Sequence, residues 1–255
     1  MPRATWKKLD CESRTADEEM TQLVPDSTRL LRRKLYDLLA AAPLIAWYLF
    51  GLTQMLPPTT QQISLAKLFF QTDPSVLPPT LVLGIVSKIC TMVFFALLVV
   101  MFAVRRVPMH YPIALYPRFV AGGGTFLGIG IVMLAPQELS SGVYLVSLLL
   151  IIGGTVFAVW ATLILARSIS IMPEARRMVT SGPYAYIRHP LYLGEFVVLF
   201  GLALQHLMPW ALLLLGVHCI FQFERMKNEE RVLARAFPNY DDYVARTARL
   251  FPGVY

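Results

Sequence analysis

Long apolar runs separated by short polar segments make up most of the chain after its first 37 residues. A helix needs roughly 20 mainly apolar residues to cross a lipid bilayer. Four of the runs are long enough, at about residues 38–56, 78–104, 116–135 and 143–166. The pattern therefore predicts an all-α fold with four transmembrane helices within residues 38–166.

A fifth apolar run covers residues 191–223 and is too long for one straight crossing. The letters QHLMP at residues 205–209 interrupt it near its middle. Because a proline cannot continue a helix but is suited to the first turn of the next one, the run predicts a tight hairpin of two short helices, 191–205 and 209–223. With this hairpin, the chain is predicted to be a polytopic membrane protein with about six transmembrane helices, followed by a cytoplasmic helical segment.

The basic residues support this number of crossings, because cytoplasmic loops carry more lysine and arginine than the loops on the other side. Nearly all of the 23 basic residues lie before the first helix, in the second and fourth loops, or after the hairpin. Lys67 and Lys88 are the exceptions. Only an even number of crossings puts all these segments on one side, so we expect an integral multi-pass protein with both termini cytoplasmic.

Composition indicates one membrane domain, because 56% of the residues are hydrophobic and only 15% are charged. The net charge of +7 comes from basic residues that flank helices, and no nucleic-acid recognition motif accompanies it. Nucleic acid is therefore not expected as a partner. Cys11, Cys90 and Cys219 have no paired spacing, so neither a disulfide framework nor a metal site is predicted.

The chain divides by pattern into three parts. Residues 1–37 are predicted to be a cytoplasmic tail that ends in an amphipathic helix at the membrane surface. Residues 38–166 hold the first four transmembrane helices, and residues 167–255 hold the hairpin and the cofactor-binding, catalytic region.

Small and ionisable residues inside the apolar runs have two different interpretations. The glycines at 122–124 and 153–154 lack the strand and helix setting of a phosphate-binding loop and predict close helix packing. Lys88 and His218 are ionisable groups in apolar spans, which makes them functional candidates. A structural role is nevertheless the favoured interpretation for both, and the position of Lys88 suits a packed or snorkelling side chain.

Polar and aromatic residues concentrate in the stretch TSGPYAYIRHPLYLGE at residues 180–195, between two apolar runs. A Gly-Pro turn signal precedes Pro190, which is suited to the first turn of a helix. This spacing places Arg188 and His189 at the mouth of the hairpin. Glu195 follows about one turn inside an apolar helix, where a carboxylate is costly unless a partner is near.

The letters GPYAYIRHPLYLG at 182–194, followed by ERMKNEERVLARAFPNYDDYVARTARLFP from residue 224, resemble the signature of the isoprenylcysteine carboxyl methyltransferase family and its bacterial phospholipid-methyltransferase-like relatives. The match has two parts with a helical hairpin between them and covers about residues 165–252. Phe237-Pro238 stands where that family usually has Phe-Gly, a departure that concerns the local turn more than the site.

The resemblance implies an integral membrane methyltransferase that moves a methyl group from S-adenosylmethionine to a lipid-like acceptor, either an isoprenylcysteine-like carboxylate or a phospholipid amine. The residues it assigns to the cofactor are His189, Tyr192, Gly194, Glu229 and Glu230, with Gly182, Pro183 and Tyr184 as the floor of the pocket. Arg188 and Arg225 match the arginines near the acceptor, where a guanidinium would hold a carboxylate. For an amine acceptor, Glu195 is the more natural partner. The sequence does not predict the oligomeric state.

Two other functions stay open. A membrane reductase that acts on an isoprenoid or sterol with NADPH can share a related cofactor-binding half. A transporter would line a path with Lys88, Glu195 and His218, although no inverted repeat with matching broken helices is visible.

Overall fold

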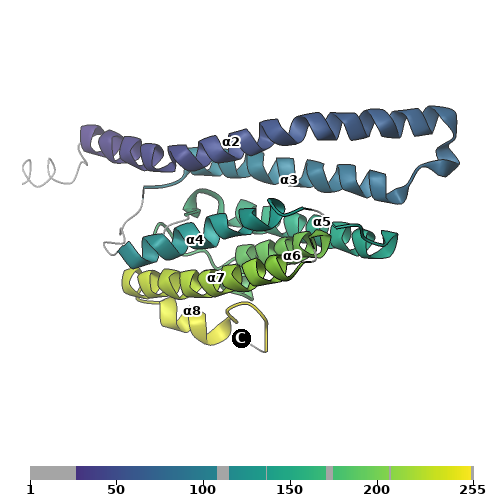
Figure 1. Cartoon of the computed structure of the whole chain (residues 1–255). Coiled ribbons are helices and arrows are strands. Elements are labelled where there is room, and N and C mark those ends of the chain that lie inside the picture. Colours follow the sequence, from purple (N-terminus) through teal and green to yellow (C-terminus); the bar gives the residue numbers. More distant parts are fainter. Residues whose placement is uncertain (1–26, 108–114, 136, 171–174, 207, 254–255) are drawn as a thin grey trace, which may run out of the picture. The chain divides into compact units, whose positions relative to one another are not determined.

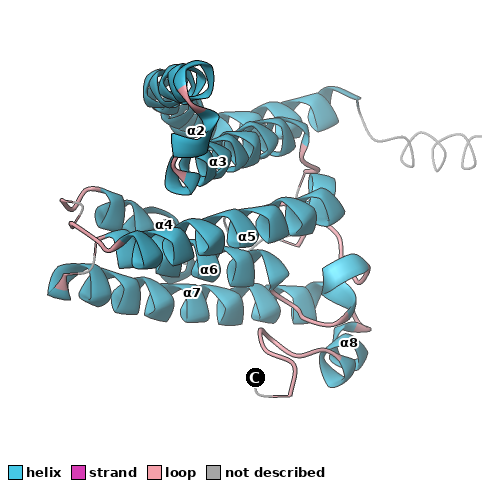
Figure 2. Cartoon of the chain, turned by 90° about the vertical axis from the view of Figure 1, so that its right-hand side faces the viewer, coloured by secondary structure: helices cyan, strands magenta, loops and turns pink. Residues whose placement is uncertain are grey.

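The structure is a computed structural model and describes residues 27–107, 115–135, 137–170, 175–206 and 208–253. Over these residues it contains seven α-helices and no strand (Figures 1 and 2), which confirms the all-α prediction. The helices are α2 (Ser27–Thr72), α3 (Pro79–Val104), α4 (Leu115–Val132), α5 (Ser141–Leu165), α6 (Pro190–Gln205), α7 (Pro209–Ala236) and α8 (Tyr240–Arg246). Most of the predicted N-terminal tail, residues 1–26, lies outside the described residues.

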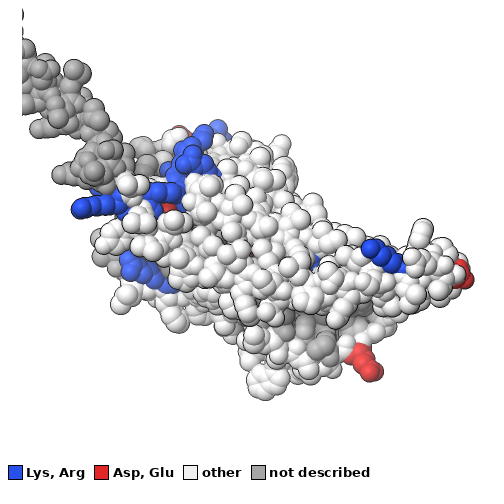
Figure 3. All heavy atoms as spheres, turned by 90° about the horizontal axis from the view of Figure 1, so that it is seen from above, with Lys and Arg blue, Asp and Glu red and all other residues white. Residues whose placement is uncertain are grey.

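Three helical segments are long and apolar enough to cross a membrane, namely Leu31–Thr72, Pro79–Val104 and Ser141–Ser168. Pro190–Gln205 is a shorter apolar helix. On the face drawn in Figure 3, a broad part of the surface carries no charged side chain. A surface of this kind suits contact with lipid. The full number of six crossings and their orientation stay predictions.

The first helix is longer than the predicted run of 38–56, since α2 begins at Ser27 and ends at Thr72. It continues through the Pro57-Pro58 pair, where the prediction ended the span. Proline inside a helix costs about 3 kcal/mol, but residues 59–72 contain neither glycine nor a further proline, and half of them are good helix formers. The helix ends only before Asp73, whose side chain accepts a hydrogen bond from the Ser75 backbone at 3.0 Å.

Residues up to Ala40 and residues from Ala41 onwards form two compact units. In the first unit, the described residues are helical. Leu31 and Leu35, which belong to the predicted amphipathic helix, are exposed there. The second unit contains α3 to α8 and every residue of the candidate site described below.

The predicted hairpin is present, because α6 ends at Gln205 and α7 begins at Pro209. The second helix does not end at residue 223 as predicted but continues without a break to Ala236. The residues beyond 223 supply charged side chains at helical spacing, such as the i,i+4 pair of Arg225 and Glu229. As a result, α7 carries the second half of the motif directly on its extension.

Close approaches between helices confirm the packing interpretation for part of each glycine group. A Cβ on Gly154 of α5 would lie 2.9 Å from the Gly194 carbonyl oxygen of α6, and a Cβ on Gly194 would lie 2.9 Å from the Gly154 oxygen. Gly123 and Gly124 of α4 face Phe221 and Gln222 of α7 in the same way. Each helix of the hairpin therefore packs closely against an earlier helix, α6 against α5 and α7 against α4 (Figure 2).

Candidate functional site

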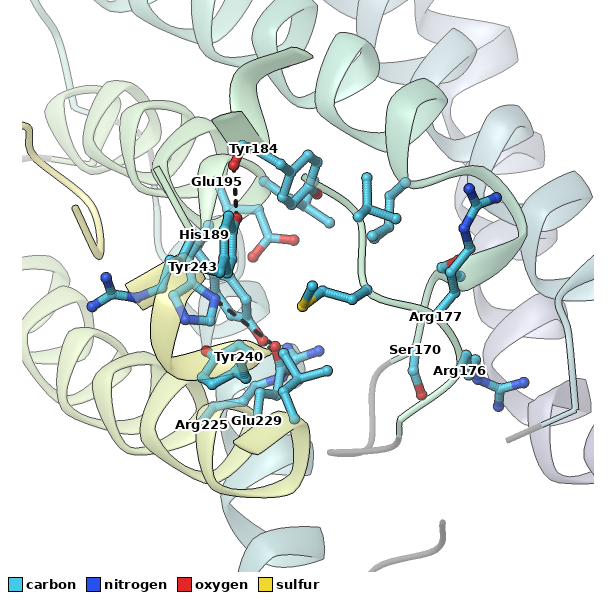
Figure 4. A pocket seen from close by; sticks show the side chains of 18 residues that line it. Ser170, Arg176, Arg177, Tyr184, His189, Glu195, Arg225, Glu229, Tyr240 and Tyr243 are labelled. Atoms are coloured by element: carbon cyan, nitrogen blue, oxygen red, sulfur yellow. Dashed lines mark hydrogen bonds and ion pairs between the residues drawn. The ribbon is translucent and has the colours of Figure 1, made fainter. Parts of the chain in front are cut away.

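A pocket lies where the stretch leading into α6 meets α7, α8 and the segment that follows α5 (Figure 4). In Figure 4, Tyr184, His189 and Glu195 lie on one side, and Arg176 and Arg177 lie on the segment opposite. The lining residues are Leu165, Ser168, Ser170, Arg176, Arg177, Met178, Val179, Tyr184, Arg188, His189, Leu191, Tyr192, Glu195, Arg225, Glu229, Leu233, Tyr240 and Tyr243.

Two sharp turns bring the chain to this pocket. At the end of α5, Ala166 has a φ of 46°, which is unusual for a residue with a side chain. Gly182 has a φ of +60°, and a Cβ there would lie 3.1 Å from Ile164. Glycine adopts this backbone without penalty, so Gly182 serves the turn that precedes the motif. Pro190 then occupies the first turn of α6, as predicted.

Residues 240–253, here called the C-terminal segment, pair with the motif and hold it in place. The Arg188 backbone N–H donates to Ala248 O at 2.8 Å, and the His189 N–H donates to Arg249 O at 3.2 Å. From α8, the Tyr243 hydroxyl donates to the Tyr184 carbonyl at 2.7 Å. Burial, partly offset by the nearby Arg188 charge, raises the pKa of Tyr243 to about 12. Tyr243 is therefore a neutral hydrogen-bond donor that ties α8 to the pocket wall.

Glu230 is surrounded by two arginines and a histidine behind the pocket wall. Its carboxylate oxygens accept from Arg188 Nε at 2.8 Å, His189 Nε2 at 3.2 Å and Arg249 Nη2 at 2.7 Å. Burial raises the pKa of the Glu230 carboxyl, but the hydrogen bonds from His189, Arg249 and Arg188 outweigh it and hold this pKa well below its usual range. Arg188 also donates to the Val244 and Thr247 carbonyls. This cluster therefore joins the motif to α7 and the C-terminal segment.

Glu229, the neighbouring residue, does line the pocket. It accepts a short hydrogen bond from the Tyr192 hydroxyl and pairs with Arg225 Nε at 3.3 Å. The Arg225 guanidinium also lies over the Tyr192 ring, 5.1 Å from its centroid, and Nη1 donates to Thr125 Oγ1 at 3.3 Å. Glu229 is thus a carboxylate at the pocket surface whose position is fixed from two sides.

Glu195 lines the same pocket with much less support. Gln222 Nε2 donates to Glu195 Oε2 at 2.9 Å. Among the residues that the structure describes, no lysine, arginine or histidine forms an ion pair with Glu195. Within this part of the chain, the hydrogen-bond partner of the carboxylate is therefore a neutral amide.

Seven of the eleven predicted site residues line the pocket, namely Arg188, Arg225, Glu195, Tyr184, His189, Tyr192 and Glu229. Gly182, Pro183, Gly194 and Glu230 do not. Gly194 is predicted to let a ligand approach the backbone, but it faces Gly154 and Ala158 of α5. Its position supports helix packing, because the close α5–α6 contact leaves no room for a Cβ.

Arg176, Arg177 and Met178 line the wall opposite the motif and were not among the predicted site residues. The two arginines entered the prediction only as basic residues of a cytoplasmic loop. Tyr240 and Tyr243 belong to the quoted motif, yet their place in the lining follows from the fold of α8. Of the ionisable span residues, His218 is buried on α7 and faces Phe196, with ring centroids 6.4 Å apart. Lys88 is half-buried on α3 and outside the pocket.

Comparisons with known proteins agree with this location. Residues 142–240 match the model of the phospholipid methyltransferase family, which includes the motif stretch and all of α7. The match confirms the predicted resemblance and points to a methyltransferase.

Two curated relatives are proteins named for metal resistance. The nickel-cobalt-cadmium resistance protein NccN of Alcaligenes xylosoxydans xylosoxydans is 31% identical over 115 residues, 45% of this chain and 52% of that protein. The cobalt-zinc-cadmium resistance protein CzcN of Cupriavidus metallidurans is 38% identical over 77 residues, 29% of this chain and 35% of that protein. The matches thus span about half and about a third of these relatives. Among the described residues, no group of three or more His, Cys, Asp and Glu side chains could hold a metal ion.

Proposed function

We propose that this chain is an integral membrane methyltransferase that transfers a methyl group from S-adenosylmethionine to a lipid-like acceptor. The observation that carries the proposal is the pocket itself. It gathers the motif residues His189 and Tyr192 with Glu229 of α7, all within the part of the chain that matches the methyltransferase family. In this proposal the protein crosses the membrane about six times, with both termini and the pocket mouth on the cytoplasmic side.

The chemistry of the pocket residues fits this cofactor. S-adenosylmethionine, when bound, supplies a methyl group on a cationic sulfonium. Glu229 offers a carboxylate for an ammonium group or ribose hydroxyls. The rings of Tyr192, Tyr184 and Tyr240 offer faces for the adenine or the cation. Glu230 contributes from behind, since its bonds to Arg188 and His189 hold the motif in place.

Transfer of a methyl group from a sulfonium needs alignment and exclusion of water more than it needs a protein nucleophile. The pocket suits this requirement, because its motif wall continues into apolar α6, while Arg225 and Glu229 come from the polar end of α7. A lipid-like acceptor would enter from the side of α6 and the cofactor from the polar side. The acceptor class in this proposal covers carboxylates and amines.

Calorimetric titration of the purified protein in detergent or lipid tests the proposal. S-adenosylmethionine and its demethylated product are expected to bind in the micromolar range, and His189→Ala is expected to abolish binding. His206→Ala is the matched control, since His206 is also buried but lies in the hairpin turn and contacts the Leu202 carbonyl at 3.0 Å. Absence of binding to folded wild-type protein would overturn the proposal. NADPH binding in its place would indicate a reductase, and ion flux without methyl transfer would indicate a transporter.

A further inference from the structure

Glu195 differs from the other two glutamates of the site in having no cation of its own among the described residues. Glu229 pairs with Arg225, and Glu230 accepts from Arg188 and Arg249. Glu195 accepts from the Gln222 amide at 2.9 Å and has no ion pair within the described part of the chain. The charge of Arg225 acts on Glu195 as well as on Glu229, so one cation serves two carboxylates. Because a carboxylate in an apolar helix is costly without a full counter-charge, the remaining positive charge is expected to come from a ligand.

Gln222 has the features of a positioning residue for Glu195. It is 1% exposed and lies where a Cβ on Gly124 would come within 2.8 Å of its Oε1. That Oε1 has no hydrogen-bond partner among the described residues. A buried amide oxygen without a hydrogen-bond partner lowers stability, so this placement of Gln222 contributes little to the stability of the fold. What it does provide is a fixed orientation of Glu195.

The arginines that line the pocket beside Glu195 are already engaged. Arg225 pairs with Glu229, donates to Thr125 and lies over the Tyr192 ring. Arg188 donates to Glu230 and to two carbonyls of the C-terminal segment. An anionic acceptor beside Glu195 would add a third negative group around Arg225, because Arg176 and Arg177 lie on the opposite wall of the pocket. Like charges gathered in one buried site are unfavourable.

We infer that Glu195, oriented by Gln222, makes the acceptor end of the pocket specific for an amine and receives the proton that the amine loses. The inference rests on the proposed methyltransferase function. An aliphatic amine arrives as an ammonium, which pairs with the Glu195 carboxylate and passes a proton to it. The neutral nitrogen then forms a bond to the methyl carbon as the bond from carbon to sulfur breaks, so the sulfonium becomes a neutral thioether and the methylated amine carries the positive charge. A carboxylate acceptor would instead give an ester and release no proton.

The chemistry of the labelled product tests this inference even while the acceptor is unidentified. Membranes that contain the protein are incubated with S-adenosylmethionine labelled in its methyl group, and the labelled lipid and protein fractions are then treated with alkali. We expect an alkali-stable label, because an N-methyl bond resists hydrolysis. A label released as methanol would reveal a methyl ester and overturn the inference while the methyltransferase function stands. Folded protein that neither binds the cofactor nor transfers a methyl group would overturn both.

Variants separate positioning from folding. Glu195→Gln is expected to lower methyl transfer at least a hundredfold, a typical contribution of proton transfer by a side chain, with affinity for S-adenosylmethionine unchanged within threefold. Gln222→Met, similar in volume but without the amide, is expected to lower the maximal rate at least tenfold and to have no further effect in the Glu195→Gln background.

Gln205→Met is the matched control, since Gln205 also donates from one helix to a neighbouring one, to Ser147 Oγ at 2.7 Å, but lies outside the pocket. Its methyl-transfer rate is expected to equal that of the wild type. Equal losses in Gln222→Met and Gln205→Met, or full activity in Glu195→Gln, would overturn the inference.

Discussion

The glutamates in and behind the two ends of the pocket have partners of opposite kinds. At the end formed by the extension of α7, Glu229 and Glu230 are neighbours whose charges are met by Arg225, Arg188 and Arg249. At the end formed by α6, Glu195 is met by the neutral Gln222 amide. Carboxylates that the protein neutralises itself can build a rigid wall, because charge-assisted bonds are strong and directional. Glu195 has no close ion pair and shares the charge of Arg225 with Glu229, so it is expected to gain from a cationic ligand.

The largest effect is expected when a cation is removed from the end of the pocket where the glutamates pair with arginines. Arg188→Met is expected to destabilise the fold by about 2–3 kcal/mol, because Glu230 loses a close ion pair and two carbonyls of the C-terminal segment lose their donor. The double variant Arg188→Met/Glu230→Gln is expected to lose less stability than the sum of the two single variants, because both changes break the same ion pair. Thermal unfolding in detergent measures both. A single variant as stable as the wild type would show that the cluster is not a structural joint.

The turn that presents the motif gives the next largest effect. Gly182→Ala is expected to destabilise the protein by about 1–2 kcal/mol, because a φ of +60° is unfavourable for a residue with a Cβ and the added atom would crowd Ile164. Gly142→Ala is the control, since a Cβ there meets nothing within 4 Å among the described residues. Unfolding midpoints that shift equally in both variants would contradict the role given to Gly182.

Lowering the pH tests the end of the pocket where arginines pair with the glutamates, because the pKa of Glu230 is shifted there. Its pKa is depressed in the folded state, so its contribution to stability is complete above the pKa of an unfolded glutamate, about 4.3. The contribution then declines as the pH falls toward the folded-state value. Glu230→Gln is expected to be less stable than the wild type at pH 7 and to lose less stability between pH 5 and pH 3. Parallel pH curves for the two proteins would contradict this.

The smallest effect is expected outside the pocket. Lys227 Nζ lies 2.7 Å from Glu224 Oε1 on α7, but the two side chains are 42% and 30% exposed. Exposed pairs of this kind contribute at most about 0.5 kcal/mol. Glu224→Gln is therefore expected to leave both the unfolding midpoint and cofactor binding unchanged, as measured by thermal unfolding and calorimetry. A loss as large as that of Arg188→Met would mean that charge on α7 matters wherever it lies.

Sequence patterns predicted the parts of the fold that depend on local periodicity and proline. The break between α6 and α7, the start of α6 at Pro190 and the arrival of Glu229 at the motif all follow from them. The extent of α2 did not follow, because the two prolines that usually end a helix lie inside it. Proline is a strong local signal, but the residues that follow the pair contain neither glycine nor a further proline, and the helix continues through it.

Which of the two neighbouring glutamates lines the pocket and which one lies behind it could not be predicted from spacing. Glu229 and Glu230 are adjacent, so they point about 100° apart on the helix, and only the placement of the C-terminal segment decides which one meets Arg249. That segment pairs with the motif across some sixty residues of sequence. Gly194 illustrates the same limit, since its motif position suggests a ligand and its actual neighbour is Gly154 of another helix.

A calorimetric titration of S-adenosylmethionine into Glu229→Gln and Glu195→Gln, side by side with the wild type, tests the central claim most directly. A charge-assisted bond is worth about 1.5–3 kcal/mol, so Glu229→Gln is expected to weaken cofactor binding by roughly tenfold to a hundredfold. Glu195→Gln is expected to bind within threefold of the wild type, because this carboxylate serves the acceptor. Equal weakening in both variants, or weakening in Glu195→Gln alone, would contradict the assignment of the two ends.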